Sequence, residues 1–115
     1  MSLDYYHRAI DKINAQVKNP TYFIFSDDLE WVFENFSFLE NKTLVETDSV
    51  VNDFNLIRLC RHNIIANSTF GWWGAFLNSN PGKIVIAPKI YFLLDAKAQA
   101  FYEKSNCMPA EWIRL

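Results

Sequence analysis

Asn67, Ser68 and Thr69 are three small hydrogen-bonding residues that directly follow a short apolar run, residues 63–66. Hydroxyl groups and free backbone N–H groups at the start of a helix bind phosphate oxygens, helped by the helix dipole. The same residue types are also the commonest helix N-caps, and the spacing alone favours that role. The glycines and the lysine of a P-loop are absent. The cluster is therefore either a phosphate-binding helix start or an ordinary cap.

Acidic residues occupy two further positions where they could contact a ligand. Asp27 and Asp28 follow the apolar run at residues 21–25, where carboxylates can bind Mg²⁺, accept a phosphoryl group or hydrogen-bond a ribose or base. They could equally cap a helix and place an acid in its first turn. Asp53 precedes another apolar segment, and its carboxylate could cap a helix or accept two N–H groups from a guanine edge.

The other reactive residue types do not combine into a recognisable catalytic group. His7 is expected on the exposed side of a helix, and His62 at a helix end, where a partly positive imidazole suits the dipole. No Ser-His-Asp or Cys-His arrangement and no metal-ligand spacing is present. Cys60 and Cys107 make no disulfide framework and indicate a reducing compartment. We identify no catalytic residue and no metal site.

Composition limits the class of protein. The chain has 115 residues, of which 50% are hydrophobic, so one small domain with a packed core is expected over residues 1–115. The net charge is -2 and no basic block is present, which argues against nucleic-acid binding. The apolar runs are too short to span a membrane, and no signal peptide is recognisable. We expect a cytoplasmic protein.

Apolar spacing and turn residues predict alternating helices and strands. Helices are expected near residues 3–17, 27–36, 54–61, 68–77 and 96–103, and strands near residues 21–25, 43–46, 63–66, 83–87 and 111–115. Such alternation predicts an α/β fold, a three-layer Rossmann-like parallel sheet of about four to five strands with helices on both faces. Ligands bind such sheets at the carboxyl ends of the strands, so the polar clusters should share one edge.

Trp72 and Trp73 lie side by side inside the helix expected after the Asn67 cluster. One helix face carries Phe70, Trp73, Gly74 and Leu77, and this face is expected to anchor the helix on the sheet. Trp72 and Phe76 form a second stripe, rotated by roughly 100 degrees. That stripe is either buried in a tight core or contacts a neighbouring domain or partner chain.

Three segments, residues 23–32, 53–78 and 83–92, together resemble the C-terminal half of bacterial α-1,2-fucosyltransferases, glycosyltransferase family 11. The strand followed by "NSTFGWWGA" is the most specific element. The resemblance implies an enzyme that transfers fucose from GDP-fucose, with inversion and without a required metal, to a terminal galactose-type acceptor. It also implies that this chain is one half of a two-domain GT-B architecture, with the acceptor bound through the missing N-terminal part.

The resemblance also implies roles for individual residues. Asp53 would contact guanine, and Asn67, Ser68, Thr69 and Phe70 would form the pyrophosphate cradle. Asp27 or Asp28 would support the nucleoside or the adjacent loop. The family's His-x-Arg-x-Asp-type motif is absent from this sequence, and Gly71 stands where the family often has serine. The isolated chain is therefore expected to be inactive and to bind GDP weakly at best.

Two alternatives from other functional classes remain at this point. The first is a receiver-like phosphoacceptor or Mg²⁺-binding domain, suggested by Asp27 and Asp28 after a strand; the third strand, however, ends without a phosphoacceptor Asp. The second is a non-catalytic interaction module that docks or dimerises through Trp72 and Phe76, a surface that a neighbouring domain would otherwise cover. The full-length enzyme could also lie peripherally at the inner membrane.

Overall fold

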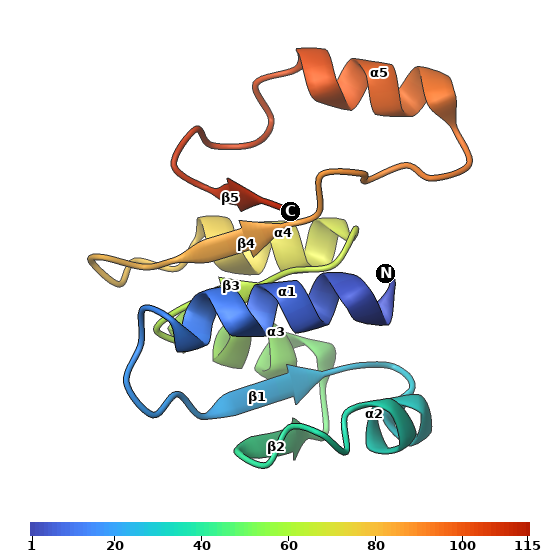
Figure 1. Cartoon of the computed structure of the whole chain (residues 1–115). Coiled ribbons are helices and arrows are strands. Elements are labelled where there is room, and N and C mark those ends of the chain that lie inside the picture. The colour runs from blue at the N-terminus through green and yellow to red at the C-terminus, as the bar shows by residue number, and fades with distance from the viewer.

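The structure, a computed structural model, describes all 115 residues and contains five helices and five strands that alternate along the chain (Figure 1). The helices are α1 (Leu3–Asn14), α2 (Leu29–Asn35), α3 (Val50–Leu59), α4 (Thr69–Phe76) and α5 (Ala96–Lys104). The strands are β1 (Tyr22–Phe25), β2 (Lys42–Val45), β3 (Asn63–Ile64), β4 (Val85–Ala87) and β5 (Ile113–Arg114). The expected order of elements is confirmed, with most strands shorter than predicted.

All strand pairs are parallel, as expected of an α/β fold, but the strands form two sheets instead of the expected one. β1 pairs with β2, with Tyr22 opposite Lys42. β4 lies between β3 and β5, with Asn63 opposite Val85 and Ile86 opposite Ile113. No backbone hydrogen bond joins β1 to β3. The prediction of a continuous sheet of four to five strands is therefore corrected to a two-stranded and a three-stranded parallel sheet.

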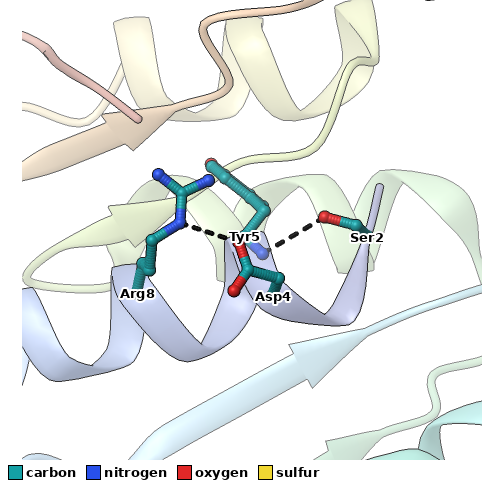
Figure 2. A network of polar contacts seen from close by, with 4 residues as sticks. All are labelled: Ser2, Asp4, Tyr5 and Arg8. Atoms are coloured by element: carbon teal, nitrogen blue, oxygen red, sulfur yellow. Dashed lines mark hydrogen bonds and ion pairs between the residues drawn. The ribbon is translucent and has the colours of Figure 1, made fainter.

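Helix α1 joins the two sheets. Ser2 caps it by accepting a hydrogen bond from the Tyr5 N–H (3.2 Å), and Arg8 pairs with Asp4 one turn away at 3.0 Å (Figure 2). The buried Tyr5 hydroxyl lies 2.6 Å from the carbonyl oxygen of Ile65 and 3.2 Å from that of Ile86. Burial raises the pKa of Tyr5, so its hydroxyl stays a neutral donor. These contacts tie α1 to the three-stranded sheet.

The other face of α1 packs toward the two-stranded sheet. Ile10 forms a buried cluster with Val32 of α2 and with Phe36, which directly follows that helix, and Ile24 and Ile64 pack against that cluster. The same Ile64 side chain also packs against the cluster around Tyr5. Figure 1 shows α1 in front of the strands and α3 and α4 behind them. Helices therefore lie on both faces, and α1 bridges the space between β1 and β3.

Helix α4 presents a different face to the sheet from the one expected. Ala75 is fully buried in the cluster formed with Ile65 and Val85, and Trp72 packs against that cluster. Trp73 is 50% exposed instead of anchoring the helix. The reason is steric, because a helix that approaches its neighbours closely must place small residues at the contact. Gly74 is such a residue, buried against Ile57 of α3.

The C-terminal segment of the same chain covers Trp72, so for this residue burial within the chain, one of the two stated alternatives, is the one observed. The Trp72 indole N–H donates to the Cys107 carbonyl (3.0 Å), and its ring lies 5.7 Å from that of Trp112. Phe76 stacks on Trp72 at 4.8 Å and remains 47% exposed. The solvent-facing side of α4 thus consists of Phe70, Trp73, Phe76 and Leu77.

Candidate functional site

A cavity of about 840 Å³ separates the two sheets and brings several predicted site residues together. Its walls include β1, residues 62–66 around β3, and apolar side chains of α1, α2 and α3. Asp27, Asp53, Ser68 and Phe70 lie on this cavity, at the ends of β1, α3 and α4 where the strands' carboxyl termini point. The predicted convergence of the segments after β1 and β3 is therefore observed, Asp53 at the start of α3 joins them, and the segment after β4 does not line this cavity.

Asp53 lies in the first turn of α3, because the helix begins at Val50 and not after Asp53 as expected. Ser49 is the N-cap, and its hydroxyl oxygen accepts the Asn52 N–H at 3.1 Å. Asp53 therefore does not cap the helix. Its Oδ1 lies 2.6 Å from the Thr47 hydroxyl, which fixes the orientation of the half-buried carboxylate. Oδ2 makes no protein hydrogen bond and remains able to accept N–H groups from a ligand.

Ser68 is the N-cap of α4, which confirms the capping interpretation for this residue. Its Oγ accepts the Gly71 N–H at 3.1 Å, and its own hydroxyl hydrogen stays available to donate. The N–H groups of Thr69 and Phe70 open the helix, where no intrahelical acceptor exists. Capping and anion binding are therefore compatible, since Ser68 satisfies only the third N–H of the helix.

The loop after β4 supports the start of α4. The Tyr91 hydroxyl donates to the Ser68 carbonyl (2.7 Å), and Asn67 Nδ2 donates to the Tyr91 carbonyl at 3.2 Å. Burial, with Tyr102 nearby, raises the pKa of Tyr91 to about 12, so this hydroxyl stays protonated near neutral pH. The Asn67 side chain is thus committed to the loop. Asn67 and Thr69 do not line the cavity, although both belong to the expected cradle.

The two aspartates after β1 have different positions. Asp28 Oδ1 accepts the Trp31 N–H at 2.9 Å, so Asp28 is the N-cap of α2. Asp27 lines the cavity and makes no side-chain hydrogen bond within the protein. Of this pair, only Asp27 is placed to contact a ligand in the cavity.

Sequence reasoning missed Thr47 and Tyr91, the two residues that position the candidate binding groups. Thr47 lies two residues before Ser49. A threonine at this spacing ahead of an apolar helix favours an ST-turn, in which its hydroxyl group bonds to the backbone two residues further on. Tyr91 lies in an apolar loop segment, and no sequence pattern marks its contact with Ser68, which is 23 residues away.

His62 differs from the expectation of a partly positive imidazole. Its Nδ1 accepts the Ile84 N–H at 2.9 Å, which requires an unprotonated Nδ1. Desolvation lowers the pKa of His62, and the neighbouring Arg61 lowers it further. The imidazole therefore holds β3 and β4 together in its neutral form, and nothing assigns it a catalytic role.

This bond predicts a pH dependence of stability. Because the folded pKa of His62 lies below the unfolded value near 6.5, the unfolded chain binds more protons in that range. The stabilisation that neutral His62 gives to the folded state is fully present above about pH 6.5. It is lost as the pH falls toward the pKa of His62 in the folded state. In urea unfolding at pH 5.5 and pH 7.5, His62→Asn, whose Oδ1 replaces the acceptor, should flatten the pH slope. His7→Asn is the matched control on α1, and an equal flattening there would contradict the assignment.

No three of the His, Cys, Asp and Glu side chains are grouped so that they could hold a metal ion. The helices are all too short or too polar to cross a bilayer.

Comparisons with known proteins agree with the geometry. The sequence profile described as "Glycosyl transferase family 11" matches residues 2–115. The O-antigen biosynthesis glycosyltransferase WbnK of Escherichia coli is 36% identical over 118 residues, covering all of this chain and 37% of that protein. The alpha-1,2-colitosyltransferase of E. coli is 32% identical, covering 96% of this chain and 38% of that protein.

A more distant relative is also similar over nearly the whole of this chain. Galactoside alpha-(1,2)-fucosyltransferase 1 of Plecturocebus brunneus is 26% identical, covering 96% of this chain and 31% of that protein. The chain thus spans 31% to 38% of the length of these curated relatives, about a third. No solved structure matches it.

Proposed function

The chain belongs to glycosyltransferase family 11, and we propose that it is the part of an α-1,2-fucosyltransferase-type enzyme that binds the GDP-sugar donor. The observation that carries this proposal is that Asp53, Ser68 and Phe70 share one cavity. One carboxylate with a free oxygen and one helix start with free N–H groups match the two ends of a nucleoside diphosphate. The receiver-like alternative is not retained, because the family membership replaces it.

Asp53 is the proposed guanine contact. Guanine presents two adjacent N–H donors on one edge, and a carboxylate accepts both, whereas adenine presents no such pair. Thr47 holds the Asp53 carboxylate at one oxygen, so the free oxygen keeps a fixed direction. Such preorganisation lowers the entropy lost when the base binds.

The start of α4 is the proposed diphosphate contact. The Ser68 hydroxyl and the N–H groups of Thr69 and Phe70 lie at the same end of the helix. Asn67 hydrogen-bonds the loop after β4, which packs beside them. During transfer the glycosidic bond breaks and negative charge grows on the departing diphosphate. Donors and a helix dipole that hold this charge stabilise the transition state more than the ground state. Asp27 is proposed to contact the nucleoside.

Fucose as the transferred sugar and a galactose-type acceptor are proposals that rest on the names of the relatives. The acceptor and the group that deprotonates its hydroxyl are assigned to parts of the longer enzymes outside the matched third. We propose that no metal is needed, that the longer protein acts in the cytoplasm or at the inner membrane surface, and that the two domains follow the GT-B plan. Dimerisation through the exposed side of α4 is a further proposal.

Saturation-transfer NMR with GDP-fucose tests which part of the donor this chain holds. We expect the guanine H8 and the ribose H1′ to receive more saturation than the fucose methyl group, because the proposed contacts are to the nucleotide. Free fucose should show no transfer. Stronger saturation of the fucose methyl group than of H8 would contradict a nucleotide-binding role.

A further inference from the structure

The cavity between the two sheets is bordered on both sides by strand edges that could pair with a further β-strand. In a parallel strand, consecutive residues direct their backbone N–H and C=O groups to opposite sides. The Tyr22 N–H bonds to Asn41 on the β2 side, so Phe23 and Phe25 direct theirs toward β3. On β3, the N–H groups of residues 63 and 65 bond to β4, so Ile64 directs its groups toward β1. Two unpaired parallel edges therefore face one cavity.

The walls of this cavity are those of a core. Ile10 and Ile13 of α1 line one side and Ile57 of α3 lines the other. Its volume, about 840 Å³, is far larger than the gaps that a packed interior leaves between its elements, and it is partly open to solvent. A backbone group that is covered without a partner costs about 1–3 kcal/mol. An occupant of this space must therefore offer backbone partners to both edges as well as apolar side chains.

Helix α1 indicates which segment fills the space. In a strand–helix–strand unit the helix packs over the two parallel strands that it joins. α1 leads into β1 and lies across both β1 and the cavity, with Ile10 on one side and Tyr5 on the other. Figure 1 shows the N-terminal end of α1 on the side to which the β1 and β4 arrows point, where a preceding parallel strand would end.

We propose that a parallel β-strand from a segment preceding α1 inserts between β1 and β3 and completes one six-stranded sheet. Numbered along the chain with the new strand first, the strand order becomes 3-2-1-4-5-6, the doubly wound order of dinucleotide-binding sheets. The strand is about five residues long and apolar on both faces, since helices cover it on each side. The curated relatives are long enough to supply it.

The inserted strand also has a consequence for the donor site, and this step rests on the proposed function. Its carboxyl end would emerge between Asp27 and Ser68, at the point where the strand order reverses. The chain that leads from it into Ser2 would then border the nucleotide. GDP should bind more tightly when the strand is present.

The test extends the chain upstream of Ser2 by a Val/Ile-rich strand and a short turn. The matched control carries the same extension with prolines at two alternate positions, which cannot donate to a ladder. The expected result is that amide exchange at Phe23, Phe25 and Ile64 is slower by about tenfold or more in the strand-bearing protein than in the proline control. This readout needs no nucleotide, so it is independent of whether GDP binds.

Four results would overturn the proposal. The first is that these amides exchange at the same rate in the strand-bearing protein and in the proline control. The second is protection of Phe25 and Ile64 in the 115-residue chain through direct pairing of β1 with β3. The third is protection that appears only in a dimer of the unextended chain, which would make a second copy the occupant. The fourth is equal protection by GDP alone. Slow exchange without any GDP binding would retain the strand and reject the donor site.

Discussion

Gly74→Ala should destabilise the protein by about 1–3 kcal/mol, the usual cost of inserting an extra carbon into a contact between helices that is already closely packed. A Cβ at this position would lie 2.5 Å from Ile57 Cγ2, well inside van der Waals contact. Ile57 is β-branched, so its methyl group has little freedom to rotate away. Since Ile57 is on α3 and Gly74 on α4, the two helices must separate to admit the added carbon.

Gly71→Ala is the matched control in the same helix. Its added Cβ would lie 3.4 Å from Ile65 Cβ, at the limit of ordinary contact, while alanine improves helix propensity by about 1 kcal/mol. We therefore expect Gly71→Ala to be neutral or stabilising in urea unfolding. Gly71→Ser should also be accommodated.

A double mutant separates the steric explanation from other effects of Gly74→Ala. Ile57→Ala removes the opposing methyl group at its own cost of about 2–5 kcal/mol. The combination with Gly74→Ala should cost less than the sum, by about 1–2 kcal/mol. Additive losses would contradict the contact. Because α3 carries Asp53 and α4 carries Ser68, the single mutant should also weaken GDP binding.

Asp53→Asn should lower the affinity for GDP by about 10- to 100-fold, the loss expected when a hydrogen bond to a charged group is removed. Asparagine keeps the size of the side chain and retains an oxygen for the Thr47 hydroxyl. It replaces the second acceptor by an NH₂ donor, which opposes the guanine N–H groups. ADP affinity should stay the same, so the preference for guanine disappears.

Asp28→Asn is the matched control, because it removes the same charge from a carboxylate that caps α2 and does not line the cavity. Isothermal titration of GDP and ADP against both variants checks the prediction. An equal loss of GDP affinity in Asp28→Asn would mean that the effect is one of net charge and not of a specific contact.

The sequence predicted those features that depend on local pattern. The alternating apolar runs and turn residues gave the order of helices and strands, and Ser68 was correctly placed at a helix start. Asp28 as a cap was one of two stated possibilities. The start of α3 was misplaced because Asp53 was considered as the cap in place of Ser49, and aspartate and serine are equally favoured N-caps, so residue type alone does not choose between them.

Features that depend on neighbours were not predictable from the chain. Helix α4 is apolar on every side, so no polar face indicates which side meets solvent, and bulky Trp73 was assigned to the contact that Ala75 and Gly74 occupy. The division into two sheets was missed for a related reason. Strand patterns report which residues are extended, whereas the pairing of β1 depends on a segment that the pattern of β1 does not describe.

The claim that this chain binds a guanosine diphosphate group can be checked by titrating GDP and ADP while amide shifts are recorded residue by residue. We expect GDP to move the amide signals of Asp53 and of residues 67–70 at about tenfold lower concentration than ADP does. The strand-bearing protein should give the same pattern with tighter binding. Equal responses to the two nucleotides, or no response at these residues in either protein, would contradict the claim.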